Sequence, residues 1–445
     1  MAMIGLAGGI GGRRPGRALA TAAARPASPE SRVAGRPRRL RAVPPAAGAL
    51  GLRDVARGGA GLVAGARYLA RLEAEVRREL AVPHVFLFSS GRAALAVLLR
   101  ALHQLSGRTE VVVPAYTCFS VPAAVVRAGL VVVPCDVDPE RFDFNPRALA
   151  RAVTGRTLCV IPTHLLGATA DVTAIAPLAR ARGAFVVEDA AQGLGGRRDG
   201  RPLGTLGDAG VFSFDRGKLV TCGSGGMVVT ASARIAAALG AGWRAAGAPG
   251  VAAAVGDVLR ALGLAVFLRP WLHWLPAAMP WLELGRTVYD PAFPIRRMSG
   301  AKAAMLAGWP ARVAAERALR AEAADDYRRR GAALAGDGGA APAVRIPLLA
   351  PDRPSRDALV RAGRRRGLGI APLYPTGIDE IPALRAGGPA ACPGAAAIAA
   401  RLLTLPGHRF ASAPVRAEIG RLVAAVLGDE RAAPPAPAGG VEAGA

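Results

Sequence analysis

Lys218 is the first candidate for chemistry, because it is one of two lysines in a chain that carries 57 lysine and arginine residues. Arginine can replace lysine wherever a surface cation is sufficient, but a guanidinium stays protonated and cannot act as an amine nucleophile. Lys218 precedes the glycine-rich segment 223–226, which predicts a short, stiff turn between two strands. With Arg216 as a nearby cation, an amine held in this way could attack an aldehyde. The second lysine, Lys302, lies in a predicted helix without chemical neighbours, and we interpret it as a chance survivor.

A pair of acids follows a buried strand in the segment 186–192. Glu188 and Asp189 stand at the carboxyl end of this strand, where open α/β sheets place their ligands. A carboxylate there is costly to bury unless it has a partner, and the protonated nitrogen of a pyridine ring is one suitable partner. The alternative interpretation of Asp189 is a helix N-cap before Ala190.

The segment 89–95 predicts a strand-to-helix turn with small residues at the start of the helix. Free backbone N–H groups and the positive end of the helix dipole make such a turn suitable for a phosphate, and Ser90 could add its hydroxyl. Ser213, five residues before the lysine, could supply a second hydroxyl to the same phosphate. An ordinary capped helix would show a similar pattern.

Short apolar strands alternate with helices over most of the chain, an order typical of an α/β domain. Runs of consecutive apolar and β-branched residues favour a mostly parallel sheet that is covered on both faces. The predicted strands span residues 85–88, 110–114, 130–135, 158–162, 184–188, 211–214 and 226–230.

The 445 residues predict one large and one small domain between two loose tails. Residues 1–48 are rich in Ala, Arg, Pro and Gly, and we expect a disordered basic tail there. Residues 49–310 would form the large domain and residues 311–427 a small C-terminal α/β domain. The Ala/Pro/Gly-rich residues 428–445 would again be loose.

The formal charge of +25 is a weak argument for nucleic acid, because nearly all of the cations are arginines and no reader motif accompanies them. We therefore expect no nucleic-acid partner. The five cysteines are scattered without C-x-x-C spacing, which predicts neither a disulfide framework nor a metal site. A reducing cytoplasm is the simplest compartment.

The stretch 258–284 contains three tryptophans and several prolines, and its longest apolar run, residues 261–268, is too short to span a bilayer. Its aromatic residues beside Arg260 and Arg269 could rest in a membrane interface, which would make the protein peripheral at the inner face of the membrane. Packing in a dimer or as a lid is the alternative.

Taken together, the segments at 89–95, 186–192 and 207–226 resemble the DegT/StrS-type family of sugar aminotransferases, which depend on pyridoxal 5'-phosphate (PLP). The resemblance extends from about Phe86 to Thr230. Further echoes are Arg296-Arg297-Met298-Ser299 and Leu405-Pro406-Gly407-His408. It implies the fold-type I transferase architecture and a homodimer with active sites between the subunits.

The resemblance also implies a role for individual residues. Lys218 would hold PLP as a Schiff base, Asp189 would contact the pyridine nitrogen, and Gln192 would hydrogen-bond the phenolic oxygen. Gly91, Arg92 and Ser213 would bind the phosphate. Relatives that catalyse dehydration have histidine in place of this lysine, so Lys218 favours transamination.

The sequence departs from the family pattern near the cofactor ring. Cys118 stands where the family usually has a stacking aromatic residue, and Tyr116 or Phe119 could take its place. Arg92 replaces a common threonine and would add a cation to the phosphate site. His164 and His408 are candidate substrate residues, although His164 is equally explained as a core histidine.

These observations predict transfer of an amino group from glutamate to a keto-sugar that is nucleotide-linked, in the biosynthesis of a surface polysaccharide or glycoconjugate. Lys218 would also move the proton between substrate and cofactor. Another fold-type I reaction and a non-catalytic PLP-binding or membrane-attached regulator are the alternatives.

Overall fold

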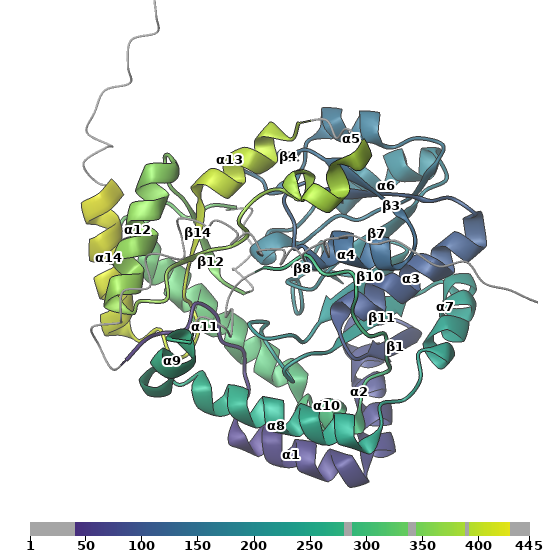
Figure 1. Ribbon diagram of the computed structural model, residues 1–445, viewed down its shortest axis with the longest axis horizontal. Coiled ribbons are helices and arrows are strands. Elements are labelled where there is room, and N and C mark those ends of the chain that lie inside the picture. Colours follow the sequence, from purple (N-terminus) through teal and green to yellow (C-terminus); the bar gives the residue numbers. More distant parts are fainter. Residues whose placement is uncertain (1–40, 280–286, 337–343, 388–390, 428–445) are drawn as a thin grey trace, which may run out of the picture. The chain divides into compact units, whose positions relative to one another are not determined.

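The computed structural model describes residues 41–279, 287–336, 344–387 and 391–427. Its main feature is a seven-stranded sheet in the order β1-β11-β10-β7-β6-β2-β3 (Figure 1). Only β11 among these strands runs against its neighbours, so the mostly parallel sheet expected from the sequence is confirmed. The strands are β1 (His84–Phe88), β2 (Glu110–Pro114), β3 (Val131–Cys135), β6 (Thr157–Val160), β7 (Phe185–Asp189), β10 (Ala209–Ser213) and β11 (Gly226–Thr230).

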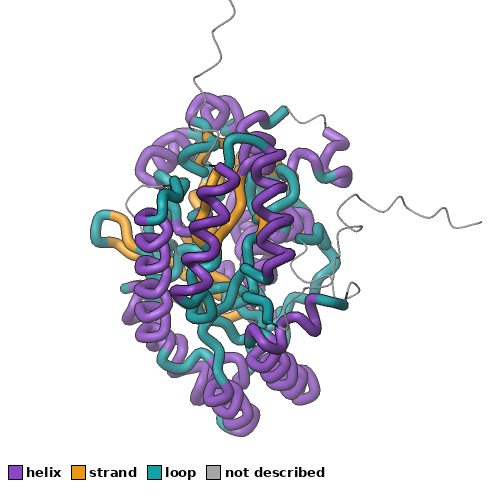
Figure 2. Tube along the Cα trace, turned by 90° about the vertical axis from the view of Figure 1, so that its left-hand side faces the viewer, coloured by secondary structure: helices purple, strands orange, loops and turns teal. Residues whose placement is uncertain are grey.

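Helices cover both faces of this sheet, as Figure 2 shows. The cause is visible in β11, where Val228 belongs to one hydrophobic cluster while Met227 and Val229 belong to another. Successive side chains of a strand point to opposite faces, so a strand that is apolar throughout needs apolar cover on each side. The helices of this region are α1 (Leu52–Val63), α2 (Gly65–Leu80), α3 (Gly91–Ser106), α4 (Ser120–Arg127), α5 (Pro146–Ala152), α6 (Val172–Ala181), α7 (Ala233–Ala245) and α10 (Gly300–Met305).

A second, three-stranded antiparallel sheet follows the long helix α11 (Trp309–Arg329). Its strands are ordered β12-β14-β13, and they lie within the range expected for the small domain. They are β12 (Ile346–Leu349), β13 (Ala371–Pro372) and β14 (Leu402–Leu405), with helices α12 (Arg353–Arg366), α13 (Pro393–Arg401) and α14 (Ala413–Leu427). Short hairpins, β4 (Val137–Asp138) with β5 (Asp143–Phe144) and β8 (Arg197–Arg198) with β9 (Arg201–Pro202), decorate the large sheet.

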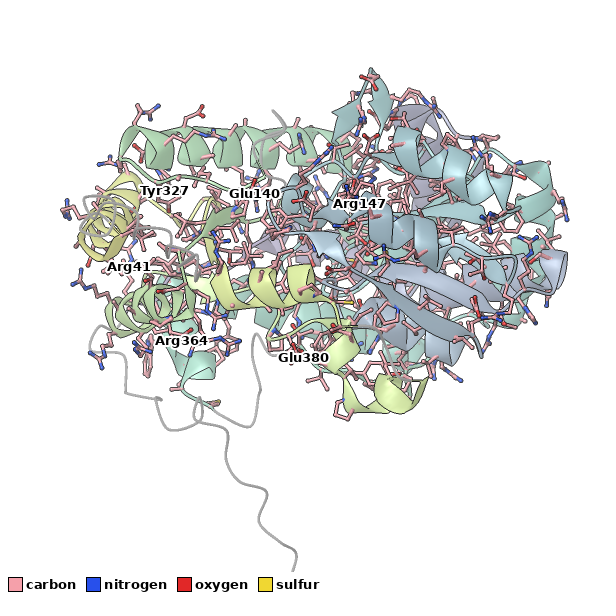
Figure 3. All side chains as sticks on the ribbon, turned by 90° about the horizontal axis from the view of Figure 1, so that it is seen from above. Arg41, Glu140, Arg147, Tyr327, Arg364 and Glu380 are labelled. Carbon is pink, nitrogen blue, oxygen red and sulfur yellow. The ribbon has the colours of Figure 1, made fainter. Side chains whose placement is uncertain are left out.

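The expectation of a disordered tail over residues 1–48 is wrong for residues 41–48. Residues 1–40 lie outside the described part of the chain, but residues 41–50 are packed, with Val43, Ala47 and Leu50 buried. In Figure 3, Arg41 lies on the same side as Arg364 of α12, and the Val43 N–H donates to the Gly367 carbonyl at 2.9 Å. An Ala/Pro/Gly-rich composition predicted disorder, but small residues can also pack in a buried segment.

Deleting this segment should therefore be far more damaging than deleting what precedes it. The Ala47 carbonyl accepts from the fully buried Arg320 at 2.9 Å, and the Pro44 carbonyl accepts from the buried His408 at 2.8 Å. Each buried donor that loses its acceptor costs about 1–3 kcal/mol. We expect a chain starting at residue 41 to unfold thermally like the full chain, and a chain starting at residue 51 to unfold at a clearly lower temperature. Equal melting temperatures would show that the segment contributes nothing.

The apolar stretch forms two helices, α8 (Val251–Phe267) and α9 (Pro270–Ala277), while the residues 280–284 of the predicted range lie outside the described part. Helix α8 runs beside α1 (Figure 1). No single helix among the described residues is long and apolar enough to cross a membrane. The two helices together have the length and composition for it, but they are bent by 116° relative to each other.

Candidate active site

Lys218 lies in the turn that connects β10 and β11, as the sequence predicts. Its backbone N–H donates to the Asp215 carbonyl at 3.1 Å, and Gly217 before it has a φ of +81°, which favours glycine. The turn is covered by the N-terminal segment, where the Ala49 N–H donates to the Leu219 carbonyl at 2.8 Å. The side chain of Lys218 is half-buried, and within the described residues its amine makes no hydrogen bond or ion pair. A stiff backbone therefore presents an uncommitted amine.

Asp189 ends β7, which pairs in parallel with β10, the strand that leads into the turn holding the lysine. Its Oδ1 accepts from the Ala191 N–H at 3.0 Å, whereas no donor of the described residues is bonded to Oδ2. Burial raises the pKa of Asp189, and the positive charge of Lys218 opposes this shift. No helix begins at Ala190, so the interpretation as a helix N-cap does not apply. A buried carboxylate with an open oxygen thus lies within electrostatic range of the free amine.

The neighbouring acid, Glu188, has no such opening. Its Oε1 accepts from the N–H groups of Leu206 and Gly207 at 2.5 and 2.7 Å, and its Oε2 accepts from Gly204 N–H and His164 Nε2 at 2.8 Å each. Glu188 therefore fixes the loop after β9 and the histidine. Of the two acids delivered by β7, Asp189 is the one left for a ligand.

His164 is completely buried and both of its ring nitrogens are engaged. Besides the bond to Glu188, its Nδ1 accepts from the Ala170 N–H at 3.2 Å. This pattern fits the core-histidine interpretation and leaves no ring nitrogen for a substrate. His408 is similar, since its Nε2 donates to the Pro44 carbonyl and its Nδ1 accepts from the Phe410 N–H at 3.3 Å. It holds the N-terminal segment in place.

The start of α3 and the end of β10 form a close-packed cradle. Ser90 caps α3, accepting from the Ala93 N–H at 3.2 Å. A Cβ added to Gly91 would lie 3.1 Å from the Cβ of Ser213, and one added to Gly226 would lie 2.5 Å from the Cα of Gly91. Two of the residues expected to bind phosphate, Gly91 and Ser213, are thus brought together beside the cap. This is the arrangement of free N–H groups and hydroxyls that an anion needs.

Arg92 points partly away from this cradle. Its guanidinium lies 4.7 Å from the centroid of the Phe293 ring and 3.8 Å from the carboxylate of Asp290. The side chain is more than one-third exposed. The backbone of Arg92 belongs to the cradle, while its guanidinium contacts the segment that leads to Arg296.

The cofactor side of the site is completed by Tyr374, which the sequence analysis missed. Tyr374 follows β13 of the small sheet, and its Oη accepts from Nε2 of Gln192 at 3.0 Å. Oε1 of Gln192 accepts from the Leu166 N–H at 3.2 Å, which fixes the orientation of the amide. The Pro372–Pro375 stretch was the available signal, but Tyr374 lies 182 residues from its partner Gln192, and local patterns do not report such contacts.

Tyr116 packs against Tyr374 with ring centroids 5.5 Å apart and is almost completely buried. Its Oη accepts from the Tyr374 N–H at 3.2 Å and donates to the Tyr374 carbonyl at 3.3 Å. Phe119 is buried in the hydrophobic cluster around α3 instead. Cys118 is half-buried, and its Sγ accepts from the Ser120 hydroxyl at 3.0 Å. Tyr116 therefore joins the two sheets, and Cys118 packs against the hydrophobic cluster that contains both tyrosines.

Residues 51–415 match the model of the DegT/DnrJ/EryC1/StrS aminotransferase family. The chain belongs to this family. The resemblance stated from the sequence is thus confirmed, and with it the fold-type I architecture. In agreement, the fold superposes on the crystal structure of DesI in the presence of its TDP-sugar product with a TM-score of 0.69 and 23% identity, covering 89% of this chain and 96% of that one.

Curated relatives match over a shorter range. A UDP-N-acetyl-3-dehydro-alpha-D-glucosamine 3-aminotransferase of Acidithiobacillus ferrooxidans is 41% identical over 165 residues, which are 37% of this chain and 44% of that protein. A pleiotropic regulatory protein of Geobacillus stearothermophilus is 37% identical over 164 residues, again 37% of this chain and 44% of that protein. The chain therefore matches less than half the length of these relatives.

PLP is the cofactor of this family, and the residues present fit it. Asp189 offers an open carboxylate oxygen at the bottom of the site, suited to a protonated ring nitrogen. The cradle of Ser90, Gly91 and Ser213 suits the phosphate. Gln192 and Tyr374 place an amide N–H and a phenol next to each other for a ring oxygen, and Lys218 supplies the amine that the aldehyde requires.

Proposed function

We propose that this protein is a PLP-dependent aminotransferase that moves an amino group from glutamate to a nucleotide-linked keto-sugar. The observation that supports this most strongly is the pairing of a buried carboxylate, open at one oxygen, with an uncommitted lysine amine. In a purely structural ion pair, the amine and the carboxylate would be in direct contact, and neither would be available to a ligand. Here the positive charge of Lys218 opposes the rise in the pKa of Asp189, yet the two groups form no ion pair, so each stays available to a ligand.

When bound, PLP supplies an aldehyde for the amine and a ring that takes up electron pairs. The chain supplies the rest. Asp189 holds the ring nitrogen protonated, because its carboxylate is buried and needs a positive partner. Lys218 carries the proton between the two carbon positions that exchange it, and Arg216 beside it stays charged and cannot. Gln192, which follows β7 of the large sheet, and Tyr374, which follows β13 of the small sheet, orient one edge of the PLP ring.

A carboxylate-bearing donor fits a cation at the start of β12. Arg345 is half-buried, and no ion pair or hydrogen bond of its guanidinium is found within the described residues. Burial lowers the pKa of Arg345, and Tyr374, the residue that contacts Gln192, opposes this shift. An arginine in such a position gains most from a planar carboxylate. We assign it to the donor glutamate.

A nucleotide-linked acceptor is supported by relatives. The name of the Acidithiobacillus protein describes a UDP-linked sugar, and DesI was crystallised with a TDP-sugar. The test is incubation of the purified protein, PLP and glutamate with a panel of UDP- and dTDP-linked keto-sugars. We expect 2-oxoglutarate and an amino sugar to appear in equal amounts. Release of 2-oxoglutarate without any amino sugar would favour another fold-type I reaction, and absence of both would favour a PLP-binding regulator.

We further propose that the working unit is a homodimer whose partner helps to close the site. The segment 287–296 lies next to the cradle through Arg92 and Phe293, and the Ser89 N–H donates to the Arg296 carbonyl at 2.9 Å. Light scattering on the purified protein gives the mass directly. A monomer with full activity would contradict this part of the proposal.

Helices α8 and α9 support peripheral contact with an anionic membrane surface. Val251, Leu259 and Trp271 are each more than half exposed, with Val255, Leu262 and Phe267 also on the surface. Helix α9 carries no acid, and the acid of α8, Asp257, is buried, so the charges available on this face are those of arginines. Apolar side chains flanked by cations suit the boundary of an anionic leaflet.

Flotation with vesicles tests this contact. We expect the wild type to float with vesicles that contain an anionic lipid, less so at high salt, and Leu259→Asp/Trp271→Ser to remain at the bottom. Val131→Asp, a change at a residue 54% exposed on β3, is the matched control and should float. If the double variant floats normally, or instead shifts from dimer to monomer, the apolar face does not serve lipid.

A further inference from the structure

Lys302 is buried at the centre of a polar network, so its interpretation as a chance survivor without chemical neighbours is wrong. The side chain emerges from α10, and Lys302 is 4% exposed. Its Nζ donates to the Ser224 hydroxyl at 2.9 Å and to the Ser89 carbonyl at 3.2 Å, and lies 3.3 Å from Oδ1 of Asp257. The ammonium therefore makes two hydrogen bonds and one ion pair inside the protein.

Asp257, the anion of this network, comes from α8 and is 6% exposed. Its Oδ2 accepts from the Ser299 hydroxyl at 2.9 Å, and its Oδ1 also accepts from the exposed Arg260 at 2.6 Å. Ser299 in turn caps α10 by accepting from the Lys302 N–H at 3.3 Å. A buried ion pair is tolerated only when the remaining lone pairs are satisfied in this way.

The two acceptors on the other side of Lys302 belong to the active site. Ser89 directly precedes the cap of α3 and Gly91, so its carbonyl fixes the beginning of the phosphate cradle. Ser224 lies in the turn between Lys218 and β11, the strand whose Gly226 abuts Gly91. One ammonium therefore joins the cradle to the turn that carries the reactive lysine. A guanidinium could not replace it, because a planar fork of five donors does not match three acceptors around one point.

We propose that Lys302 is a positioning residue that sets the distance between the phosphate cradle and the turn of Lys218. It does not touch the cofactor, and it acts through Ser89 and Ser224. This inference rests on the proposed PLP site. It implies that loss of the network weakens binding of the phosphate group, while chemistry at the lysine continues once the cofactor is bound.

The test uses Lys302→Met/Asp257→Asn, in which both charges are removed so that no unpaired ion remains buried. The apo forms of the variant and of the wild type are titrated with PLP and with pyridoxal, which has the aldehyde but no phosphate. We expect the dissociation constant for PLP to rise about tenfold or more, that for pyridoxal to stay unchanged, and kcat at saturating PLP to stay within about threefold. Arg260→Ala, which removes only the exposed partner of Asp257, is the matched control and should leave both constants unchanged.

Three outcomes would overturn the proposal. An unchanged constant for PLP, with only the melting temperature lowered, would make the network purely structural. An equal rise for PLP and pyridoxal would place its effect on the lysine rather than on the cradle. Wild-type affinity for PLP in the single variant Lys302→Arg would show that any buried cation at this position suffices. If the wild type itself binds neither PLP nor pyridoxal, the proposed function has failed instead.

Discussion

Lys218→Ala should lose amine transfer by a factor of about 10² to 10⁴, the usual contribution of a positioned proton-transfer group. The amine is held by a turn that the N-terminal segment covers, so no other lysine can reach its place. Borohydride should fix PLP to the wild type and leave the variant unlabelled, as measured by absorbance and by the mass of the protein. The alanine variant should still fold, since the side chain makes no bond within the described residues, but it should melt slightly lower at neutral pH because the charge that opposes the rise in the pKa of Asp189 is gone.

Lys218→Arg is the matched control for charge. It keeps a cation near Asp189 but cannot supply a free amine at any accessible pH. We expect it to be as inactive as the alanine variant and unlabelled by borohydride. Retained transfer in either variant would rule out the role assigned to Lys218.

Asp189→Asn should separate stability from function. Without its carboxylate the ring nitrogen is no longer held protonated, and removing a preorganised charge of this kind costs about 10² to 10³ in rate. The amide keeps an oxygen for the Ala191 N–H, so the local turn should survive. We expect this loss of rate to appear in kcat, measured with glutamate at saturating PLP. Asp215→Asn, the same change at an exposed acid three residues from the lysine, should leave the rate unchanged.

In the apo protein, Asp189→Asn should raise the stability at neutral pH, although it lowers the rate of the holoenzyme. Burial raises the pKa of Asp189 above its ordinary value of 3.8, so the ionised carboxylate is less stable in the folded than in the unfolded chain. At neutral pH this lowers the free energy of unfolding of the wild type. The asparagine variant should therefore melt at a higher temperature, and the difference should shrink as the pH falls through the raised pKa toward 3.8. A variant that melts lower at neutral pH would contradict a net cost of burying this charge.

The strands and the residues that follow them could be predicted from the sequence, because their signals are local. Lys218 and Asp189 follow apolar runs within a few residues, and the structure places Asp189 at the end of β7 and Lys218 in the turn after the neighbouring parallel strand β10. Tyr374 and the Lys302–Asp257 pair could not be predicted in this way. Their partners lie between about 40 and 200 residues away, and only the packing of one element on another creates the contact.

The histidines and the N-terminal segment illustrate the converse limit. His164 and His408 stand at positions that suggested a substrate role, but their ring nitrogens are satisfied by backbone groups and by Glu188. Composition alone predicted disorder up to residue 48, although residues 41–48 accept hydrogen bonds from buried donors. A residue type shows which chemistry is available, and the partners within the fold decide whether it is used.

The scarcity of lysine has a practical consequence for anyone who wishes to observe this protein. Of the two ε-amines, that of Lys302 is buried with two hydrogen bonds and an ion pair, whereas that of Lys218 makes no hydrogen bond or ion pair within the described residues. Apart from the α-amino group, an acylating fluorophore would find a single internal target, located where turnover occurs. Because the chain has so few lysines, the ε-amine of Lys218 can be labelled selectively. Protection of this amine against the label then reports that the cofactor is bound.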